Sequence, residues 1–375
     1  MSDYIVKIYT PQELNHSSYI QTGLFELERD SFIKTKVVLS LAKRLGTIRV
    51  TDSGIKQTNQ PHPKTSFYQL IDTKSGRKIN FAADLYDSSD SFSAYALEHC
   101  DYIFKRNFEA KNVEKLPKEA RHKIHPLGLV FGTHSKHQEG ILKFFLGLLL
   151  TNLSIDSKAD RNFLKRIRIS YQKQISHWKF TRTTRLIDHF EKVTPFTENS
   201  VFFQTRCFSS EEQEDVKQIH QQRFRIIVLL KEKFKEKFKG GIMPSALANE
   251  KYKEALTNLP TDPVSYLNMV KSAKVVIYSR GLLYSPAWKM PEYLSQGKII
   301  VAEKLTAELL VPLEHGKEVL FFEDENQLIP LIEEVLKNDD LCEKLSQNAK
   351  KYFDTYVHPK ENVKRILNFM LSQKV

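Results

Sequence analysis

The sequence predicts an α/β fold made of two domains. With 375 residues, the chain is too long for one ordinary hydrophobic core and suits two. Stretches of strand and helix character alternate through both halves, as in doubly wound sheets. Hydrophobic residues make up 41% of the chain and aromatic residues 11%, so each domain can bury a core of its own.

The first domain is expected to cover residues 1–193. A polar loop containing His16 is predicted to join its first strand to a helix over residues 19–28. From Gly140 to about Val193 the pattern becomes helical and basic. Strands are predicted at residues 4–9, 67–71, 78–82, 101–104 and 124–129, and Pro126 assigns the last one to a sheet edge or strand end.

The second domain is expected to cover residues 194–355, followed by a terminal helix over residues 356–375. A long helix over residues 211–239 is predicted to stop at Gly240-Gly241, a pair typical of a helix C-cap. Asp340 and Glu343 have the spacing of a capping box, which predicts a further helix start. Buried strands are predicted at residues 200–205, 275–278, 298–302 and 319–322.

The charge balance is basic, because Lys and Arg exceed Asp and Glu by 57 − 45 = 12. Eight basic residues and no acidic one lie between Arg161 and Arg185. Such a run fits nucleic acid, an anionic membrane, an anionic small molecule or a solvated helix face. The three cysteines form no disulfide or zinc pattern, and no signal segment or membrane span is expected, which predicts a cytoplasmic protein.

Residues 279–303 carry the clearest functional pattern: an irregular loop after a buried strand, a short helix and a second buried strand. Ligands of open α/β sheets bind outside the carboxyl ends of the strands, beside the helix N-termini that follow. Arg280, Lys289 and Glu292 are therefore expected beside a phosphorylated, polyhydroxylated ligand. By their spacing alone, Lys289 and Glu292 could also form a surface pair.

A resemblance to a known family supports the first interpretation. The pattern Lys-x-x-Glu-Tyr-Leu-x-x-Gly-Lys-x-Ile-Val, which begins at Lys289, is followed by Leu313-Glu-His-Gly316. Together they resemble the nucleotide-sugar-binding half of GT-B glycosyltransferases of the group 1, family 4-like type. The resemblance extends from about Phe202 to the C-terminus.

The resemblance implies two Rossmann-like domains facing a cleft, with the C-terminal helix packing back on the N-terminal domain. It implies that Glu292 binds the ribose of the donor and that a basic residue near Arg206 binds its diphosphate; Arg206 could instead form an interdomain salt bridge. Tyr284 stands where many retaining members have a second glutamate, which favours inversion. No metal or other cofactor is implied. The predicted donor site comprises Arg206, Arg280, Ser285, Lys289, Glu292 and Tyr293.

In the first domain, three carboxylates follow the strand predicted at residues 78–82: Asp84, Asp87 and Asp90. Asp84 or Asp87 could be the general base that deprotonates an acceptor hydroxyl, with His16 as the competing base. The carboxylates could also hold a divalent cation, or Asp87 or Asp90 could cap a helix over residues 92–99. Asp90, Lys105 and Arg106 are expected on the acceptor side, where the two cations face an anionic acceptor or solvent.

These observations predict a glycosyltransferase that moves a sugar from a nucleotide-sugar donor to a hydroxyl of a glycan or lipid-linked acceptor. Assembly of a bacterial surface polysaccharide or glycan is the expected setting, with the basic segment docked on the anionic inner face of a membrane. Two alternatives remain. Tyr171 and Trp178 inside the basic run are compatible with a nucleic-acid-binding protein, and Tyr284 is compatible with an inactive scaffold.

Overall fold

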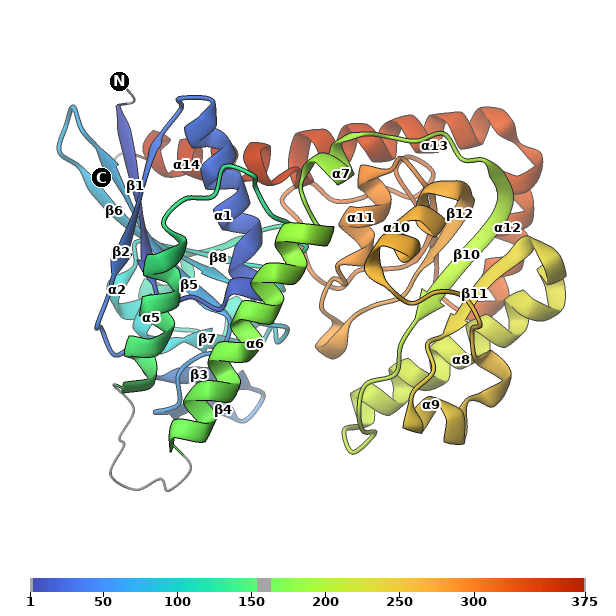
Figure 1. Cartoon of the computed structure of the whole chain (residues 1–375), viewed down its shortest axis with the longest axis horizontal. Helices are drawn as coiled ribbons and strands as arrows, with labels where there is room; N and C mark the ends of the chain where they lie inside the picture. Colours follow the sequence, from blue (N-terminus) through green and yellow to red (C-terminus); the bar gives the residue numbers. More distant parts are fainter. Residues whose placement is uncertain (1–2, 154–162, 374–375) are drawn as a thin grey trace. The chain divides into compact units, whose positions relative to one another are not determined.

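The computed structural model describes residues 3–153 and 163–373, which form two compact units (Figure 1). Unit 1 consists of Met1–His189, Ala307–Leu310 and Tyr356–Val375. Unit 2 consists of Phe190–Thr306 and Val311–Thr355. The chain therefore passes from the first unit to the second and returns to the first at its C-terminal end.

Unit 1 is built on a six-stranded sheet with the order β2-β1-β5-β6-β8-β9. The strand β5 pairs antiparallel with both β1 and β6, whereas the other neighbours are parallel. The sheet is thus a parallel α/β sheet into which the β5–β6 hairpin is inserted. Its strands are β1 (Tyr4–Thr10), β2 (Lys34–Leu39), β5 (Thr65–Asp72), β6 (Lys78–Asp84), β8 (Tyr102–Lys105) and β9 (Ile124–Pro126).

A small second sheet with the order β4-β3-β7 completes the strands of unit 1. These strands are β3 (Thr47–Thr51), β4 (Gly54–Thr58) and β7 (Ser91–Ser93). The helices of the unit are α1 (Leu14–Arg29), α2 (Ala94–His99), α3 (Ala110–Val113), α4 (Lys118–Arg121), α5 (Ile141–Leu153), α6 (Phe163–Thr184) and α14 (Pro359–Ser372), and the short helix α7 (Asp188–Glu191) spans the boundary with unit 2. No described helix is long and apolar enough to cross a bilayer.

The C-terminal helix α14 packs against α1 of unit 1, as expected (Figure 1). Asn362 on α14 donates hydrogen bonds from Nδ2 to the hydroxyl of Tyr19 and to the carbonyl of Leu127, each at 3.0 Å. Gly23 permits this close approach, because a Cβ atom there would lie 2.4 Å from the carbonyl oxygen of Pro359. Both polar contacts are buried, so they define how the helix docks.

Unit 2 is built on a five-stranded, entirely parallel sheet with the order β11-β10-β12-β13-β14. The first strand lies inside the sheet and the next two flank it, which is the doubly wound, Rossmann-like arrangement. Its strands are β10 (Glu198–Thr205), β11 (Phe238–Ile242), β12 (Ala273–Tyr278), β13 (Ile299–Glu303) and β14 (Leu320–Phe322). Its helices are α8 (Glu214–Phe234), α9 (Ala246–Lys251), α10 (Pro263–Ser272), α11 (Lys289–Ser295), α12 (Leu328–Lys337) and α13 (Asp339–Tyr352).

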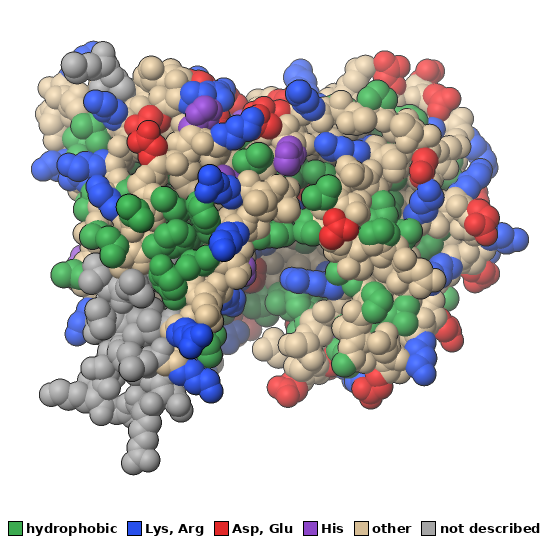
Figure 2. Space-filling model, viewed as in Figure 1, with side chains coloured by type: hydrophobic (Ala, Val, Ile, Leu, Met, Phe, Trp, Pro, Cys, Tyr) green, Lys and Arg blue, Asp and Glu red, His purple; other side chains and the backbone are tan. Residues whose placement is uncertain are grey.

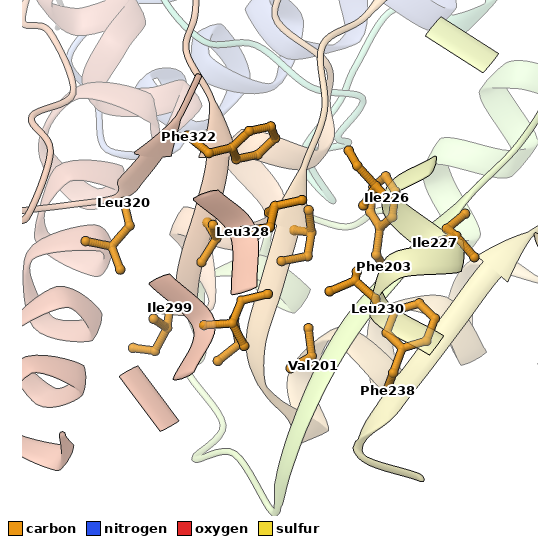
Figure 3. Packing of buried hydrophobic residues seen from close by; sticks show 14 of the residues in the cluster. Val201, Phe203, Ile226, Ile227, Leu230, Phe238, Ile299, Leu320, Phe322 and Leu328 are labelled. Atoms are coloured by element: carbon orange, nitrogen blue, oxygen red, sulfur yellow. The ribbon is translucent and has the colours of Figure 1, made fainter. Parts of the chain in front are cut away.

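The core of unit 2 joins the sheet to the helices that cover it (Figure 3). Every residue of β12 is buried, as in a strand covered on both faces. Apolar side chains from all five strands and from the helices α8, α9, α12 and α13 form one cluster, which includes Val201, Phe203, Ile226, Ile227, Leu230, Phe238, Ile299, Leu320, Phe322 and Leu328.

Gly240-Gly241 do not form a helix C-cap, so that prediction was wrong. The helix α8 ends at Phe234, and the two glycines lie inside β11 with φ angles of 141° and 136°. A Cβ atom on Gly240 would lie 2.0 Å from the carbonyl oxygen of Phe203. The glycines therefore let β11 run close beside β10.

Two predicted helix starts also differ from the structure. Ser93, and not Asp87 or Asp90, caps α2, because its side chain accepts from the backbone N–H of Ala96. Asn338 caps α13 in place of Asp340, accepting from the backbone N–H of Leu341 at 3.0 Å. In both cases a short polar side chain nearer to the observed helix start satisfies a free backbone N–H.

Candidate functional site

The carboxyl edge of the unit 2 sheet gathers the segments in which the sequence predicts a ligand site. The strand β10 ends at Thr205 directly before Arg206, and β12 ends at Tyr278 before an irregular loop over residues 279–285. The helix α11 then begins at Lys289 and carries Glu292 in its first turn. Parallel strands bring their carboxyl ends to one edge, so these segments converge there.

Arg223 lies at the centre of this edge, although the sequence analysis did not select it. Its guanidinium donates from Nε to Oγ of Ser279 at 3.3 Å, from Nη1 to the carbonyl of Arg206 at 3.0 Å and from Nη2 to the carbonyl of Arg280 at 3.2 Å. All three acceptors are uncharged. Burial lowers the pKa of Arg223 to about 10, which still leaves it a cation at neutral pH.

The helical pattern of α8 could have identified Arg223 from the sequence. Ile219, Ile226, Ile227 and Leu230 form the buried face of this amphipathic helix, and Arg223 falls on the same face. An arginine among buried apolar positions needs a specific polar partner. Here its partners are the backbones of the two loops after β10 and β12, which it ties together.

Lys289 is the third cation at this edge, and its ammonium group donates to the carbonyl of Gln204. Burial lowers the pKa of Lys289 to about 7, and repulsion by Arg223 and Arg206 contributes to the shift. None of these three cations forms an ion pair with a carboxylate of the described residues. Arg206, Arg223 and Lys289 are called the cationic cluster below.

Glu292 lies one helical turn after Lys289 and is only 5% exposed, so the two residues are not a surface pair. Its negative charge favours the protonated form of Lys289. The neighbouring Tyr293 is fully buried, and its hydroxyl lies 3.1 Å from that of Tyr266. Glu292 is therefore the carboxylate beside the cationic cluster, while Tyr293 packs beneath it.

Arg280, in contrast, has its charge matched. Its Nη1 lies 2.6 Å from Oδ1 of Asp215 and its Nε lies 3.5 Å from Oε1 of Glu303. Its guanidinium also lies over the ring of Tyr284, 3.7 Å from the centroid. These contacts shape the loop over residues 279–285.

The same loop holds two residues in a left-handed backbone conformation, Leu283 with φ 52° and Tyr284 with φ 58°. Oδ2 of Asp215 accepts from the backbone N–H of Leu283 at 2.8 Å. Ser285 is buried, and its backbone closes a tight turn by accepting from Gly281 at 2.9 Å and donating to Leu282 at 3.0 Å. Backbone strain of this kind persists only where surrounding contacts impose it.

Glu211 anchors the segment after β10. Its carboxylate accepts from Nδ1 of His220 at 2.7 Å, from the hydroxyl of Tyr252 at 2.5 Å and from Nζ of Lys251 at 2.8 Å. Although burial raises the pKa of Glu211, these hydrogen bonds lower it to about 2. Nε2 of His220 accepts from the backbone N–H of Phe208 at 2.8 Å, so the segment that carries Arg206 is held in place.

At the carboxyl edge of the unit 1 sheet, Asp84 and Lys105 form a buried ion pair of 2.9 Å. Nε2 of His62 lies 3.3 Å from the carboxylate, and the backbone N–H of Tyr86 donates to it at 3.1 Å. Burial raises the pKa of Asp84, but Lys105 and His62 outweigh that effect and hold it well below the usual range. A carboxylate held ionised in this way is a weak proton acceptor.

The other two carboxylates are also engaged. Asp87 lies 2.8 Å from Nη1 of Arg106 and 2.5 Å from Nζ of Lys64. Asp90 accepts from Nε of Arg49 at 2.9 Å. The predicted acids and the predicted acceptor-binding cations thus pair with one another. No group of three metal-ligating side chains is placed to hold a metal ion within the residues that the structure describes.

His16 lies within the first turn of α1 and not in a loop, which corrects the prediction. Its Nδ1 lies 2.8 Å from Oε2 of Glu13, a residue that the sequence analysis did not select. Burial raises the pKa of Glu13, but the close contact with the imidazole of His16 outweighs that effect and lowers the pKa. The charge on His16 also lowers the pKa of Asp87, after the larger effects of Arg106 and Lys64. A carboxylate that orients an imidazole is an arrangement suited to proton transfer.

No family model and no curated protein matches the chain. Similar solved structures include the C-terminal domain of a glycosyl transferase group 1 family protein (LpcC) from Francisella tularensis, with 12% identity, 43% of this chain and 87% of that one covered, and a TM-score of 0.30. Sucrose-phosphate synthase from Thermosynechococcus elongatus has 11% identity, with 74% and 75% covered and a TM-score of 0.35. A mutant of S. aureus TarM in complex with Fondaparinux, alpha-GlcNAc-glycerol and UDP has 14% identity, with 88% and 72% covered and a TM-score of 0.36. The fold described above rests on the strand order and register of this chain alone.

Proposed function

We propose that the chain is a glycosyltransferase that moves a sugar from a nucleotide-sugar donor to a hydroxyl acceptor. The observation that supports it most directly is the cationic cluster beside the buried carboxylate of Glu292. Both lie at the carboxyl edge of a parallel sheet, where open α/β folds bind nucleotides. A diphosphate and a ribose are the two groups that such a pair of charges would recognise.

In this proposal unit 2 binds the donor. The diphosphate would balance the charges of Arg206, Arg223 and Lys289, and it would remove the repulsion that lowers the pKa of Lys289. Glu292 would accept hydrogen bonds from the ribose hydroxyls. The cations would also stabilise the negative charge that develops on the diphosphate as the glycosidic bond breaks. Arg280, Ser285 and Tyr293 would shape this site without touching the donor.

Unit 1 would supply the acceptor side of the reaction. We propose that His16, oriented by Glu13, takes the proton from the acceptor hydroxyl as that oxygen attacks the anomeric carbon. Bond formation to the acceptor and loss of the nucleoside diphosphate would occur in one inverting displacement. The nucleotide sugar is a substrate, and this scheme uses no resident cofactor. A glycan or lipid-linked acceptor in bacterial surface polysaccharide assembly is the proposed setting.

A donor screen tests the assignment of unit 2. Saturating UDP-, GDP-, dTDP- or CMP-sugars should raise the melting temperature, because a ligand that binds only the folded state stabilises it. Lys289→Met should reduce the shift at the same ligand concentration. Lys239→Met is the matched control, since Lys239 lies on β11 and pairs with Glu198 at 2.7 Å. If no nucleotide sugar shifts the parent protein, or if Lys289→Met responds like Lys239→Met, the donor assignment is wrong.

A kinetic test addresses the base. His16→Gln should lower the transfer rate by about 10²–10⁴-fold, and Glu13→Gln should lower it by about tenfold. Donor affinity should stay unchanged in both variants. If donor binding occurs but the parent protein transfers no sugar to any glycan acceptor, the chain is a binding scaffold. Full activity of His16→Gln would remove this residue as the base.

We also propose that α5 and α6 dock on an anionic membrane. Leu142, Leu146 and Ile169 are exposed large hydrophobic side chains on these helices. Exposed basic residues accompany them, namely Lys143, Lys165, Arg168 and Lys173. Figure 2 shows hydrophobic side chains gathered over α5 and basic side chains along α6. An apolar surface flanked by cations fits the interface of an anionic bilayer; Arg161, at the start of the basic run, lies outside the described residues.

Co-sedimentation with vesicles tests this docking. The protein should bind phosphatidylglycerol vesicles and not phosphatidylcholine vesicles, and Leu142→Ser with Leu146→Ser should release it. Leu310→Ser is a control, because Leu310 is an equally exposed leucine outside these helices. Equal binding of the double variant would contradict docking through α5. A steeply salt-dependent affinity for RNA or DNA without vesicle binding would favour the nucleic-acid alternative.

A further inference from the structure

A cavity of about 370 Å³ lies in unit 1, within the size range of small-molecule sites. It opens on one face of the main sheet, between β1, β5 and β6, the segment after β2 and the helix α2. It shares no residue with the cationic cluster or with the set formed by Glu13 and His16. Its lining comprises Tyr9, Ser40, Arg44, Phe67, Tyr68, Gln69, Asn80, Tyr95, His99 and Cys100.

Arg44 supplies the only side-chain cation that is charged at every physiological pH in this lining. Its Nη1 donates to the carbonyl of Pro11 at 3.4 Å, whereas its Nε is buried without a hydrogen-bond partner. It forms no ion pair with any carboxylate of the described residues. Asp101, which follows the lining, instead accepts from the backbone N–H of Asn80 at 2.8 Å.

The electrostatic neighbours of Arg44 leave its charge unbalanced. Burial lowers the pKa of Arg44, and the acidic groups that oppose this shift are Tyr95, Cys100 and Tyr9. Phenols and thiols are uncharged at neutral pH. Burial also raises the pKa of Cys100 to about 12, so this thiol supplies no counter-charge.

The walls of the cavity are aromatic. The guanidinium of Arg44 lies over the ring of Phe67, 4.4 Å from its centroid. Tyr95 meets Phe67 edge to face at 5.3 Å between centroids and lies 4.3 Å from the ring of His99. Such a box offers ring edges and faces against which a flat ligand can pack.

Amide groups from the sheet contribute hydrogen-bonding capacity. Nε2 of Gln69 donates to Oδ1 of Asn80 at 2.9 Å, and Oε1 of Gln69 accepts from Nζ of Lys7 at 3.1 Å. Within the part of the chain that the structure describes, Nδ2 of Asn80 donates to no protein atom and remains available to a ligand. The lining thus combines one unmatched cation, an aromatic box and an amide donor.

We propose that this cavity binds a small organic anion, a phosphate or carboxylate carried on a six-membered ring. The anionic group would pair with the guanidinium of Arg44, and the ring would pack against Tyr95 and Phe67. Asn80 would donate to a polar substituent of the ring. This site is separate from the one proposed for the sugar donor, and it stands whether or not the transferase assignment is correct.

Calorimetric titration with four probes tests the proposal. Phenyl phosphate represents an aromatic ring and glucose 6-phosphate a saccharide ring, and phenol and glucose are their neutral counterparts. At least one phosphate should bind, and its neutral counterpart should bind at least ~10-fold more weakly, because the charge-assisted hydrogen bond is lost. Each titration is repeated with the Arg223→Met variant. Binding that persists in this variant is assigned to the cavity and not to the cationic cluster.

Arg44→Gln should weaken the bound phosphate by ~10- to 100-fold. Arg77→Gln, at another half-buried arginine of unit 1, should change nothing. Ser40→Trp, which adds bulk to the lining and leaves Arg44 in place, should block binding even if Arg44→Gln fails to fold. The proposal is overturned if neither phosphate binds with a Kd below about 10 mM. It is also overturned if the neutral probes bind equally well, or if Ser40→Trp binds like the parent.

Discussion

The two units carry charged clusters at the carboxyl edges of their sheets, and the clusters differ in how their charges are balanced. In unit 1, Asp84 pairs with Lys105 and Asp87 pairs with Arg106, so acids and bases neutralise one another. In unit 2, Arg206, Arg223 and Lys289 meet without an ion-paired carboxylate, and their repulsion helps to lower the pKa of Lys289. A matched buried cluster is destabilised when one partner is removed, because the other charge is left unpaired, whereas an unmatched one gains stability when an anion binds.

The largest expected effect comes from breaking a matched pair. Asp84→Asn should lower the free energy of unfolding by about 3–5 kcal/mol, because it leaves the fully buried ammonium of Lys105 without its counter-charge. Urea denaturation measures this change. Asp52→Asn is the control, since Asp52 pairs with Lys115 at a fully exposed position, where solvent screens the pair, and its loss should change the stability far less. Equal stabilities of the two variants would show that the Asp84 pair is not the structural element inferred here.

An intermediate effect is expected from removing a cation of the unmatched cluster. Arg223→Met should weaken binding of a nucleoside diphosphate by ~10- to 100-fold, because charge-assisted hydrogen bonds and the tie between two loops are lost. Arg225→Met serves as the control, because Arg225 lies on the same helix and pairs with Glu325 at 2.6 Å. Titration calorimetry gives both affinities. A folded Arg223→Met protein that retains the parent affinity would remove Arg223 from the site.

The smallest effect is a pH dependence of the same binding. Burial lowers the pKa of Lys289 in the free protein from its usual 10.5 to about 7, so above pH 7 the residue is increasingly neutral. A bound diphosphate raises that pKa, so binding should take up a proton and affinity should fall by up to roughly tenfold per pH unit between these two values. Calorimetry in buffers of different ionisation enthalpy counts the proton.

The control for this pH dependence is Lys289→Met. This variant should bind more weakly and show no proton uptake. Its free form should be at least as stable as the parent at pH 7, because an apolar side chain replaces a desolvated and repelled ammonium beside Phe203 and Tyr266. Proton uptake that persists in Lys289→Met would assign the titration to another group.

The comparison also shows which parts of the sites a sequence can predict. The order of strand, loop and helix over residues 279–303 follows from local patterns, and it placed Glu292 at the carboxyl edge of the sheet. Spacing could not show that Arg280 forms ion pairs with Asp215 and Glu303. Nor could it show that Arg223 reaches the backbones of two loops.

Two errors have the same physical origin. Gly240-Gly241 looked like a helix end because glycine favours positive φ angles, but the same freedom also allows two strands to approach closely. Asp87 and Asp90 looked like caps of a nearby helix. In the fold, Asp87 instead forms ion pairs with Arg106 and Lys64, and Asp90 forms one with Arg49. Local chemistry permitted both outcomes, and the neighbours in space selected one.

The sequence alone determined the α/β class and the buried strands of unit 2, because hydrophobic periodicity is a local property that survives in the fold. Only the tertiary structure decided which charges are matched. Which charges are paired depends on which elements are neighbours in space. The sheet order brings Asp84 to Lys105, and the fold of unit 2 brings the helix residues Arg223 and Lys289 close enough to repel each other.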